Sequence, residues 1–400
     1  MIDRIINNYF LTIFSILPVA ILVGSSVSLI NVLLIDISFI FYLIYKKEKF
    51  YQKNKVLKYL IILFIYLAFN TIISIDYNLS AYRNLGFIRL IILFLAFNFF
   101  FKENVFLHKV LKIWCVIILI VVLDVFYETV FGKNILGFAS NYGERVVSFF
   151  KDEPIVGGYL NAFYLIVIGF LLNNYDNKNK LIFCLSLAIL ASIVFTGERS
   201  NTIKAFTGFL ILFSIYPKFT LKFKITSFLT IVIIGFLVIF NNNSLKKRFI
   251  EQIQALSTKE GNPYSIIYKS GFKVFYNNPI LGVGTKNYRA ETCNNLLQDD
   301  DYICQTHPHQ IYLEFLAEHG LIGSSIIFYL LYKVIFSKIR LVISSQNYIQ
   351  TGAGIYMILV FFPFIPSGAF FSDYLITLFS INLAIFYCSN SKTNTCIKNA

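Results

Sequence analysis

Two histidines stand close together in the segment THPHQIYLEFLAEHGLIG, which covers residues 306–323. The chain has only four histidines, and these two, His307 and His309, directly precede an apolar run. An imidazole whose pKa is about 6.5 can take a proton from a hydroxyl group at neutral pH. The segment therefore predicts general-base chemistry by His309, with His307 in support. The alternative is that both rings cap a helix and bind water.

The residues around His309 also predict where a helix starts. Pro308 disfavours helical conformation at His307, so the helix is expected to begin at His309. The positive end of a helix disfavours an imidazolium, and the ring would therefore stay neutral and able to accept a proton. Glu318 lies nine residues farther on, across a regular helix from His309, and is expected to fix the turn at Gly320.

Arginines near the ends of apolar runs form a second group that could do chemistry. A planar guanidinium suits bidentate recognition of phosphate better than the point charge of lysine. Together these arginines favour an anion site for the pyrophosphate of a lipid, whereas any one of them alone could be a headgroup anchor. They are Arg83, Arg89, Arg145 and Arg199, of which Arg83 is expected to serve as an anchor.

The six cysteines differ in their surroundings. Cys293 and Cys304 share one polar connection and are expected to form a disulfide if that connection faces an oxidising compartment, the alternative being two free thiols. Cys115, Cys184, Cys388 and Cys396 are expected to be reduced. Neither the cysteine spacing nor the acidic run at 299–301 is typical of a metal site, so we assign no metal and no cofactor.

The composition defines the elements that must position these residues. The chain of 400 residues is 57% hydrophobic and only 14% charged, far from the composition of soluble domains. It predicts an all-α polytopic membrane protein, since apolar runs of roughly 17–25 residues can cross a bilayer. The first run is expected to be a retained helix and not a removable signal peptide. About twelve spans are expected, at 8–23, 27–45, 59–75, 86–101, 113–131, 155–172, 181–195, 202–216, 225–241, 320–336, 351–367 and 371–388.

The lysines and arginines indicate how the spans are oriented. The net charge of +14 is scattered over loops, which does not indicate a nucleic-acid-binding face. Most of these cations fall in alternate connections, which places both termini in the cytoplasm by the positive-inside rule. The short outside connections hold only six of them: Arg83, Arg89, Lys133, Arg145, Lys151 and Arg199.

One long outside connection, 242–308, separates the ninth and tenth spans, and long connections in compact bundles are often functional. The apolar spacing within 264–275 predicts a surface helix that ends before Pro279. Gly282 and Gly284 then allow a close backbone approach. We divide the chain into a membrane part, 1–241, a loop part that carries the histidines, 242–319, and a second membrane part, 320–400.

Three acidic residues, Asp36, Asp124 and Glu128, lie within or near expected spans. An ionisable group there is costly unless it faces protein or water. The sequence leaves open whether they join helices or line a functional cavity.

The segment HPHQIYLEFLAEHGLIG resembles the signature of the O-antigen ligase and O-antigen polymerase family, in which a histidine precedes an asparagine and E-x-G-x-x-G follows. The matching positions are His309, Glu318, Gly320 and Gly323, while Gln310 stands in place of the asparagine. FKVFYNNPILGVGTKNY, TGERSN and RVVSFFKDEPIVGGYL are similar to other family segments, and the layout of spans around one large loop also agrees.

The resemblance implies a GT-C-like, inverting glycosyltransferase in the bacterial inner membrane. It would transfer a glycan at the periplasmic face from undecaprenyl pyrophosphate to a hydroxyl of lipid A-core (a ligase) or of a growing glycan (a polymerase), without metal or nucleotide. The expected pyrophosphate ligands are Arg199 and Arg289, with Arg145 and Arg89 as weaker candidates. His309 would activate the acceptor, and His307 could replace it.

A lipid-linked polysaccharide flippase is the alternative function, because it too needs many helices and a basic cavity. A flippase predicts cations along a path through both leaflets. The arginines here gather on one side and the charges within spans are few and acidic, which favours chemistry at one face. A purely structural subunit would leave these arginines and His309 unexplained.

Overall fold

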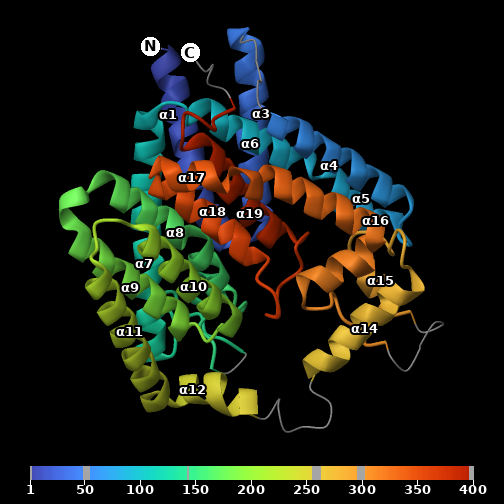
Figure 1. Cartoon of the computed structure of the whole chain (residues 1–400). Helices are drawn as coiled ribbons and strands as arrows, with labels where there is room; N and C mark the ends of the chain where they lie inside the picture. Colours follow the sequence, from blue (N-terminus) through green and yellow to red (C-terminus); the bar gives the residue numbers. More distant parts are fainter. Residues whose placement is uncertain (1, 48–54, 142–143, 255–262, 295–301, 396–400) are drawn as a thin grey trace.

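The computed structural model describes residues 2–47, 55–141, 144–254, 263–294 and 302–395. Every regular element in these ranges is helical, which confirms the all-α class (Figure 1). Six of the described helices are long and apolar enough to cross a membrane. The count rises to seven if Arg4–Ser15 and Leu17–Val23, which meet at a bend of 41°, form one span.

Each of the twelve expected spans overlaps a helix or the bent pair, but only six of the described helices, or seven with the bent pair, are long and apolar enough to cross a membrane. The helices before the long connection are α1 (Ile2–Ser15), α2 (Leu17–Val23), α3 (Ser25–Lys46), α4 (Lys55–Ile72), α5 (Tyr77–Leu85), α6 (Ile88–Phe100), α7 (Asn104–Phe131), α8 (Val156–Asn174), α9 (Asn179–Phe195), α10 (Arg199–Ile215) and α11 (Leu221–Asn241). Short 3-10 turns are η1 (Ser148–Phe150) and η2 (Asp176–Lys178).

The long connection contains α12 (Asn243–Lys246), a π-helical turn η3 (Lys247–Glu251), α14 (Pro263–Asn277) and α15 (Tyr288–Thr292). The surface helix expected within 264–275 is thus present as α14, and it ends before Pro279. The chain continues with α16 (Ile311–Val334), η5 (Phe336–Lys338), α17 (Ile339–Ser345), α18 (Tyr348–Val360) and α19 (Asp373–Cys388).

Helix α8 lies at the centre of the bundle, and nearly all of its residues are buried. It packs against α18, α10, α9 and α7, and α18 also packs against α19 (Figure 1). At the crossing with α18, a Cβ on Gly169 would lie 2.1 Å from the carbonyl oxygen of Tyr348, and one on Gly352 would lie 2.2 Å from that of Leu165. Only glycine allows this approach, which is a common way to pack helices in membranes.

The expected span 351–367 was too long, since α18 ends at Val360. Pro363 and Pro366 each lack a backbone N–H and cannot continue a helix, which explains the early end. Residues 361–372 form an irregular connection instead. It lies beside the histidine segment, since the Ser367 N–H donates to the carbonyl oxygen of His309 at 2.9 Å.

Candidate functional site

A cavity of about 380 Å³ opens where several connections predicted to lie outside the membrane come together. Its walls come from the segment before α8, the start of α10, the long connection and the connection between α18 and α19. We call it the arginine–histidine cavity after its charged and titratable lining. That lining includes Arg145, Arg199, Arg248, His307 and His309.

Three of these residues carry guanidinium groups close enough to repel one another. Burial, and then the charges of Arg145 and Arg199, lower the pKa of Arg248 to about 10. The Arg248 side chain is anchored through Nε and Nη2, which donate to the carbonyl oxygen of Gly197 at 3.3 Å and 3.2 Å. Like charges gathered in a partly buried cavity are costly without a counter-charge. The arrangement is therefore suited to binding an anion with more than one negative charge.

One carboxylate, that of Glu198, also lines this cavity. It accepts hydrogen bonds from the backbone N–H of Gly157 at 2.6 Å and from Nδ2 of Asn201 at 2.6 Å. Burial raises the pKa of Glu198 to about 7 against these hydrogen bonds and the charge of Arg145. The carboxylate thus lies beside the N-terminus of α8, where the helix dipole favours a negative charge.

The two histidine rings lie beside each other with centroids 4.1 Å apart and planes tilted by 49°, but their hydrogen bonds differ. His307 Nε2 lies 3.3 Å from the carbonyl oxygen of Ser367, which can only accept, so Nε2 carries the proton. Its Nδ1 then accepts from the Thr306 hydroxyl at 2.9 Å. No hydrogen bond joins the His309 ring to the described residues, and this ring lines the cavity. His309 is thus the ring with nitrogen atoms available to a ligand.

Burial lowers the pKa of both histidines. For His307 the value falls to about 4, through burial first and then through the charges of His309 and Lys286. For His309 burial is the cause. Both rings are therefore neutral at pH 7 and can accept a proton.

The expected helix start at His309 was wrong. Helix α16 begins at Ile311, and Gln310 is its N-cap, with Oε1 accepting from the backbone N–H of Leu313 at 2.8 Å. His309 lies outside the helix with a left-handed φ of 52°. Burial keeps the His309 ring neutral, and a place in the first helical turn does not. The helix starts later than expected because the side chain of Gln310, one residue farther along, caps its free N–H groups.

The E-x-G-x-x-G segment shapes the scaffold under the histidines. Gly320 has a φ of 62° and interrupts the helical geometry of α16. A Cβ there would lie 2.4 Å from Ile280, and a Cβ on Gly282 would lie 2.5 Å from Glu318. The N–H groups of Val283 and Gly284 donate to the carbonyl oxygens of Ala317 and Glu318 at 3.0 Å and 2.9 Å. The glycines thus join the loop before α15 to the kink of α16.

Two further contacts fix this kink. The Glu318 carboxylate is buried, which raises its pKa, and the nearby backbone N–H groups of Lys286 and Tyr288 act against that rise. A Cβ on Gly323 would lie 1.7 Å from the hydroxyl oxygen of Tyr66, whose hydroxyl lies 3.0 Å from Nδ1 of His319. These residues act on the site by positioning the segment that carries His309.

We expect Gly320→Ala to destabilise the protein by at least about 1–3 kcal/mol, because the new side chain would be strained at a left-handed φ and would also meet Ile280. The measurement is the midpoint of thermal unfolding of the purified protein in detergent. Gly235→Ala on α11 is the matched control, since a Cβ there meets no atom within 4 Å. Equal midpoints for the two variants would contradict the proposed role of Gly320.

Other residues singled out in the sequence lie elsewhere. Arg289 is exposed on α15 and does not line the arginine–histidine cavity. Arg89 and Arg83 both form ion pairs with Asp373, the Arg89 pair at 2.6 Å, and Arg89 lines a different cavity. Cys293 and Cys304 are joined by a disulfide. The acidic run at 299–301 and Cys396 lie outside the described residues.

Two of the three acids left open by the sequence join elements together. Glu128 accepts from the backbone N–H groups of Val147 and Ser148 at 3.0 Å and 2.6 Å, and Asp124 accepts from the N–H of Ile135 at 3.0 Å. Both hold the connection before α8 against α7. The third, Asp36, is buried with no hydrogen-bond partner among the described residues, and the charge of Arg89 acts on it.

Sequence reasoning missed three contributors to the site. Arg248 was not singled out, although the basic run KKR at 246–248 could have drawn attention to it. Lys286, in the segment GVGTKNY, acts electrostatically on His307. The connection after α18 donates the Ser367 N–H to the carbonyl oxygen of His309 at 2.9 Å. Glu314 secures this connection by accepting from the N–H of Phe370 at 2.9 Å.

No curated protein matches the chain. The family model described as O-antigen ligase matches residues 184–328, which include Arg199, Arg248, both site histidines and the E-x-G-x-x-G segment. The match agrees with the resemblance carried by the histidine signature, and it supports assignment of this segment to the O-antigen ligase and polymerase family.

Proposed function

We propose that the protein is a periplasmic-face glycosyltransferase that moves a glycan from undecaprenyl pyrophosphate to a sugar hydroxyl. The observation that carries the proposal is the meeting, in one cavity, of three guanidinium groups with the unbonded ring of His309. The family match supports a glycan-transferring activity in general. The donor, the acceptor and the residue roles are our proposal.

In the proposed reaction the acceptor oxygen attacks the anomeric carbon of the donor sugar. The bond from that carbon to the pyrophosphate oxygen breaks, so the configuration inverts. His309 takes the acceptor hydroxyl proton, and the lipid pyrophosphate leaves with the bonding electron pair. Arg199, Arg248 and Arg145 stabilise the negative charge that develops on it. These side chains perform every step, and we propose that the reaction needs no metal.

The proposed membrane arrangement has twelve spans, both termini in the cytoplasm and the cavity at the periplasmic side of the bacterial inner membrane. It is supported by the lining of the arginine–histidine cavity, which comes from connections that the alternation of spans assigns to one side. The parts 1–241 and 320–400 would form the membrane body, and 242–319 would bring the histidine segment to it.

We expect the rate of transfer to be constant between about pH 8 and 7 and to fall only below about pH 6.5, since burial lowers the pKa of His309 from its ordinary value. The neutral, active form is present above that pKa and is lost as the pH falls through it. The measurement is the pH dependence of kcat/KM. Glu198→Gln is the control, because it removes the cavity carboxyl whose pKa is about 7 but keeps an oxygen that can cap α8. A decline that begins above pH 7 in this variant would contradict the role of His309.

The experiment that tests the function is a reconstituted assay in proteoliposomes. It combines the purified full-length protein, an undecaprenyl-pyrophosphate glycan and either lipid A-core or a second donor molecule, with EDTA in every sample. One discrete shift of lipid A-core on a gel would establish a ligase, which we favour, and a ladder from donor alone would establish a polymerase. Donor that crosses the membrane without any new glycosidic product would overturn the proposal in favour of a flippase.

A further inference from the structure

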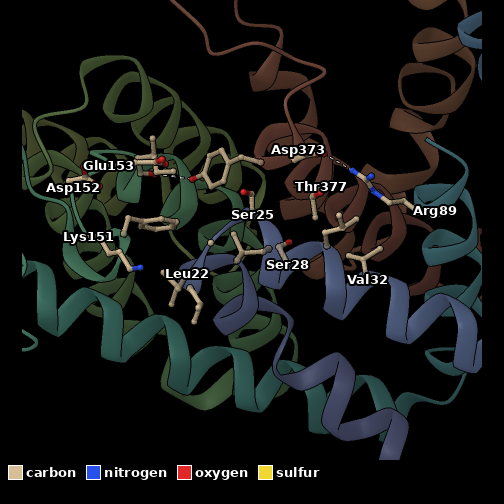
Figure 2. Close-up of a pocket in the computed structure, with 17 residues that line it drawn as sticks. Leu22, Ser25, Ser28, Val32, Arg89, Lys151, Asp152, Glu153, Asp373 and Thr377 are labelled. Carbon is tan, nitrogen blue, oxygen red and sulfur yellow. Dashed lines mark hydrogen bonds and ion pairs between the residues drawn. The ribbon is translucent and has the colours of Figure 1, made fainter. Parts of the chain in front are cut away.

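A second cavity, of about 250 Å³, lies on the other side of the start of α19 (Figure 2). The junction of α2 and α3, the start of α6, residues 150–155 and the first turns of α19 line it. Figure 2 shows Lys151, Asp152 and Glu153 at one end, Arg89 with Asp373 at the other, and Ser25 and Ser28 between them.

The two cavities are neighbours separated by a thin wall. Ser372, Leu375 and Leu378 face the arginine–histidine cavity, and Asp373 and Thr377 face the second one. These positions alternate because they lie on two faces of the same helix. Tyr374 and Ile155 line both cavities, and the Tyr374 hydroxyl donates to the carbonyl oxygen of Ile155 at 2.9 Å.

The lining of the second cavity does not fit an anion. Arg89 is already paired with Asp373 at 2.6 Å, so its charge is largely compensated. Lys151 is the remaining cation of the lining, and it shares the opposite end with the carboxylates of Asp152 and Glu153. This balance contrasts with the three guanidinium groups of the neighbouring cavity.

The lining does fit a carbohydrate, because a sugar ring offers hydroxyl groups that both donate and accept, and apolar C–H faces that pack on aromatic rings. Hydroxyls of Ser25, Ser28 and Thr377 can donate and accept, and the Asp152 carboxylate can accept from sugar hydroxyls. The ring of Phe150 supplies an apolar wall. A few polar groups on a partly apolar wall are what a small-molecule site needs for orientation and affinity.

An apolar groove continues from this cavity. Val19, Ile117, Ile120 and Phe138 are among its walls, and it shares Leu22, Val23 and Lys151 with the second cavity. Its volume is about 380 Å³, and it lies between α2 and α7, each of which has exposed residues in its wall, such as Val19 and Ile120. A molecule that fills both spaces would have a sugar head joined to an apolar chain.

We propose that the second cavity binds the sugar head of a lipid-linked saccharide, the acceptor of the reaction, with its apolar chain in the groove between α2 and α7. The inference rests on the proposed function, to which it adds the place and the chemical class of the second substrate. The acceptor sugar reaches the arginine–histidine cavity past Tyr374, whose hydroxyl bridges α19 and the segment before α8. Donor and acceptor thereby enter from opposite faces of α19.

The first test is photocrosslinking of the full chain in cells that produce it. The photoreactive residue p-benzoylphenylalanine replaces Ser25, which lines the cavity, or its neighbour Ser26, which is also exposed but does not line it. We expect adducts that contain both sugar and lipid from position 25, and phospholipid adducts alone from position 26. Sugar-free adducts at both positions would overturn the proposal.

The second test is kinetic and uses the reconstituted transfer assay. We expect Ser28→Leu, which fills the second cavity, to raise the KM for the acceptor about tenfold, as the loss of one or two hydrogen bonds would, and to leave the KM for the donor unchanged. Arg199→Ala should affect the donor instead. Equal acceptor KM values in the wild type and in Ser28→Leu, with matching unfolding midpoints, would overturn the proposal.

The failures of the two proposals are distinguishable. If transfer proceeds normally in Ser28→Leu, the proposal that the second cavity binds the acceptor is wrong, and the glycosyltransferase assignment stands. If the protein performs no transfer, the glycosyltransferase assignment is wrong. Sugar-containing adducts at position 25 would then still show that the second cavity binds a glycolipid.

Discussion

Replacing His309 with alanine is expected to lower the kcat of glycan transfer by about 10²–10⁴-fold, the range over which a positioned general base contributes. The expectation rests on the unbonded, neutral ring of His309 at the edge of the arginine–histidine cavity. The KM for the donor should change little, because the arginines that bind the pyrophosphate remain. The measurement is steady-state transfer in proteoliposomes under saturating donor.

His307→Ala separates a chemical role from a structural one. Both nitrogens of His307 are engaged, by Thr306 and by the Ser367 carbonyl, so its loss is expected to reduce transfer less than the loss of His309. Added imidazole should restore part of the activity of His309→Ala and none of that of His307→Ala. If His307→Ala shows the larger loss and the imidazole rescue, the roles of the two rings are reversed.

The helical segments were predictable because a chain in lipid must satisfy its backbone hydrogen bonds within each segment. Apolar runs therefore mark helices even where their ends are uncertain. Prolines decided one such end: 361–367 is as apolar as a span, yet Pro363 and Pro366 turn it into a connection that contacts His307 and His309. Hydropathy indicates whether a segment prefers lipid to water. It does not show that a proline lacks the backbone N–H needed to continue a helix.

The site was predictable in its residue types and only partly in its members. His309 could be found because its neighbours in sequence, Pro308 to Gly323, also position it in space. Arg199 and Arg248 come from different helices, so no local pattern joins them. Arg289 and Arg248 lie in the same long connection, and only the path of the backbone places Arg248 in the cavity and leaves Arg289 exposed on α15.

The start of α16 was predicted in the correct segment but two residues too early, at His309 and not at Ile311. The rule that proline precedes or opens a helix excluded His307 correctly, but the cap fell on Gln310. The N-cap is the residue whose polar side chain accepts from a backbone N–H two or three residues farther on. Here Oε1 of Gln310 accepts from the N–H of Leu313. The difference moves His309 into a left-handed conformation outside α16 and toward the cavity.

Arg248→Ala is expected to lower kcat by about 10²–10³-fold, since removal of one preorganised donor at a developing negative charge costs about that much. Its Nε and Nη2 are anchored by the carbonyl oxygen of Gly197, which holds the guanidinium at the cavity without neutralising it. Arg248→Lys should recover little of the activity, because a lysine cannot make the paired contacts to phosphate oxygens.

Arg289→Ala is the matched comparison for Arg248, since both arginines come from the long connection and only Arg248 lines the cavity. We expect the loss of kcat in Arg248→Ala to exceed that in Arg289→Ala by at least about tenfold, given the magnitude expected for a donor that contacts the leaving group. Donor binding, measured with the lipid pyrophosphate alone, should weaken in Arg248→Ala and in Arg199→Ala. A larger effect at Arg289 would mean that the pyrophosphate is bound beside α15, and that the three guanidinium groups of the cavity serve another anion.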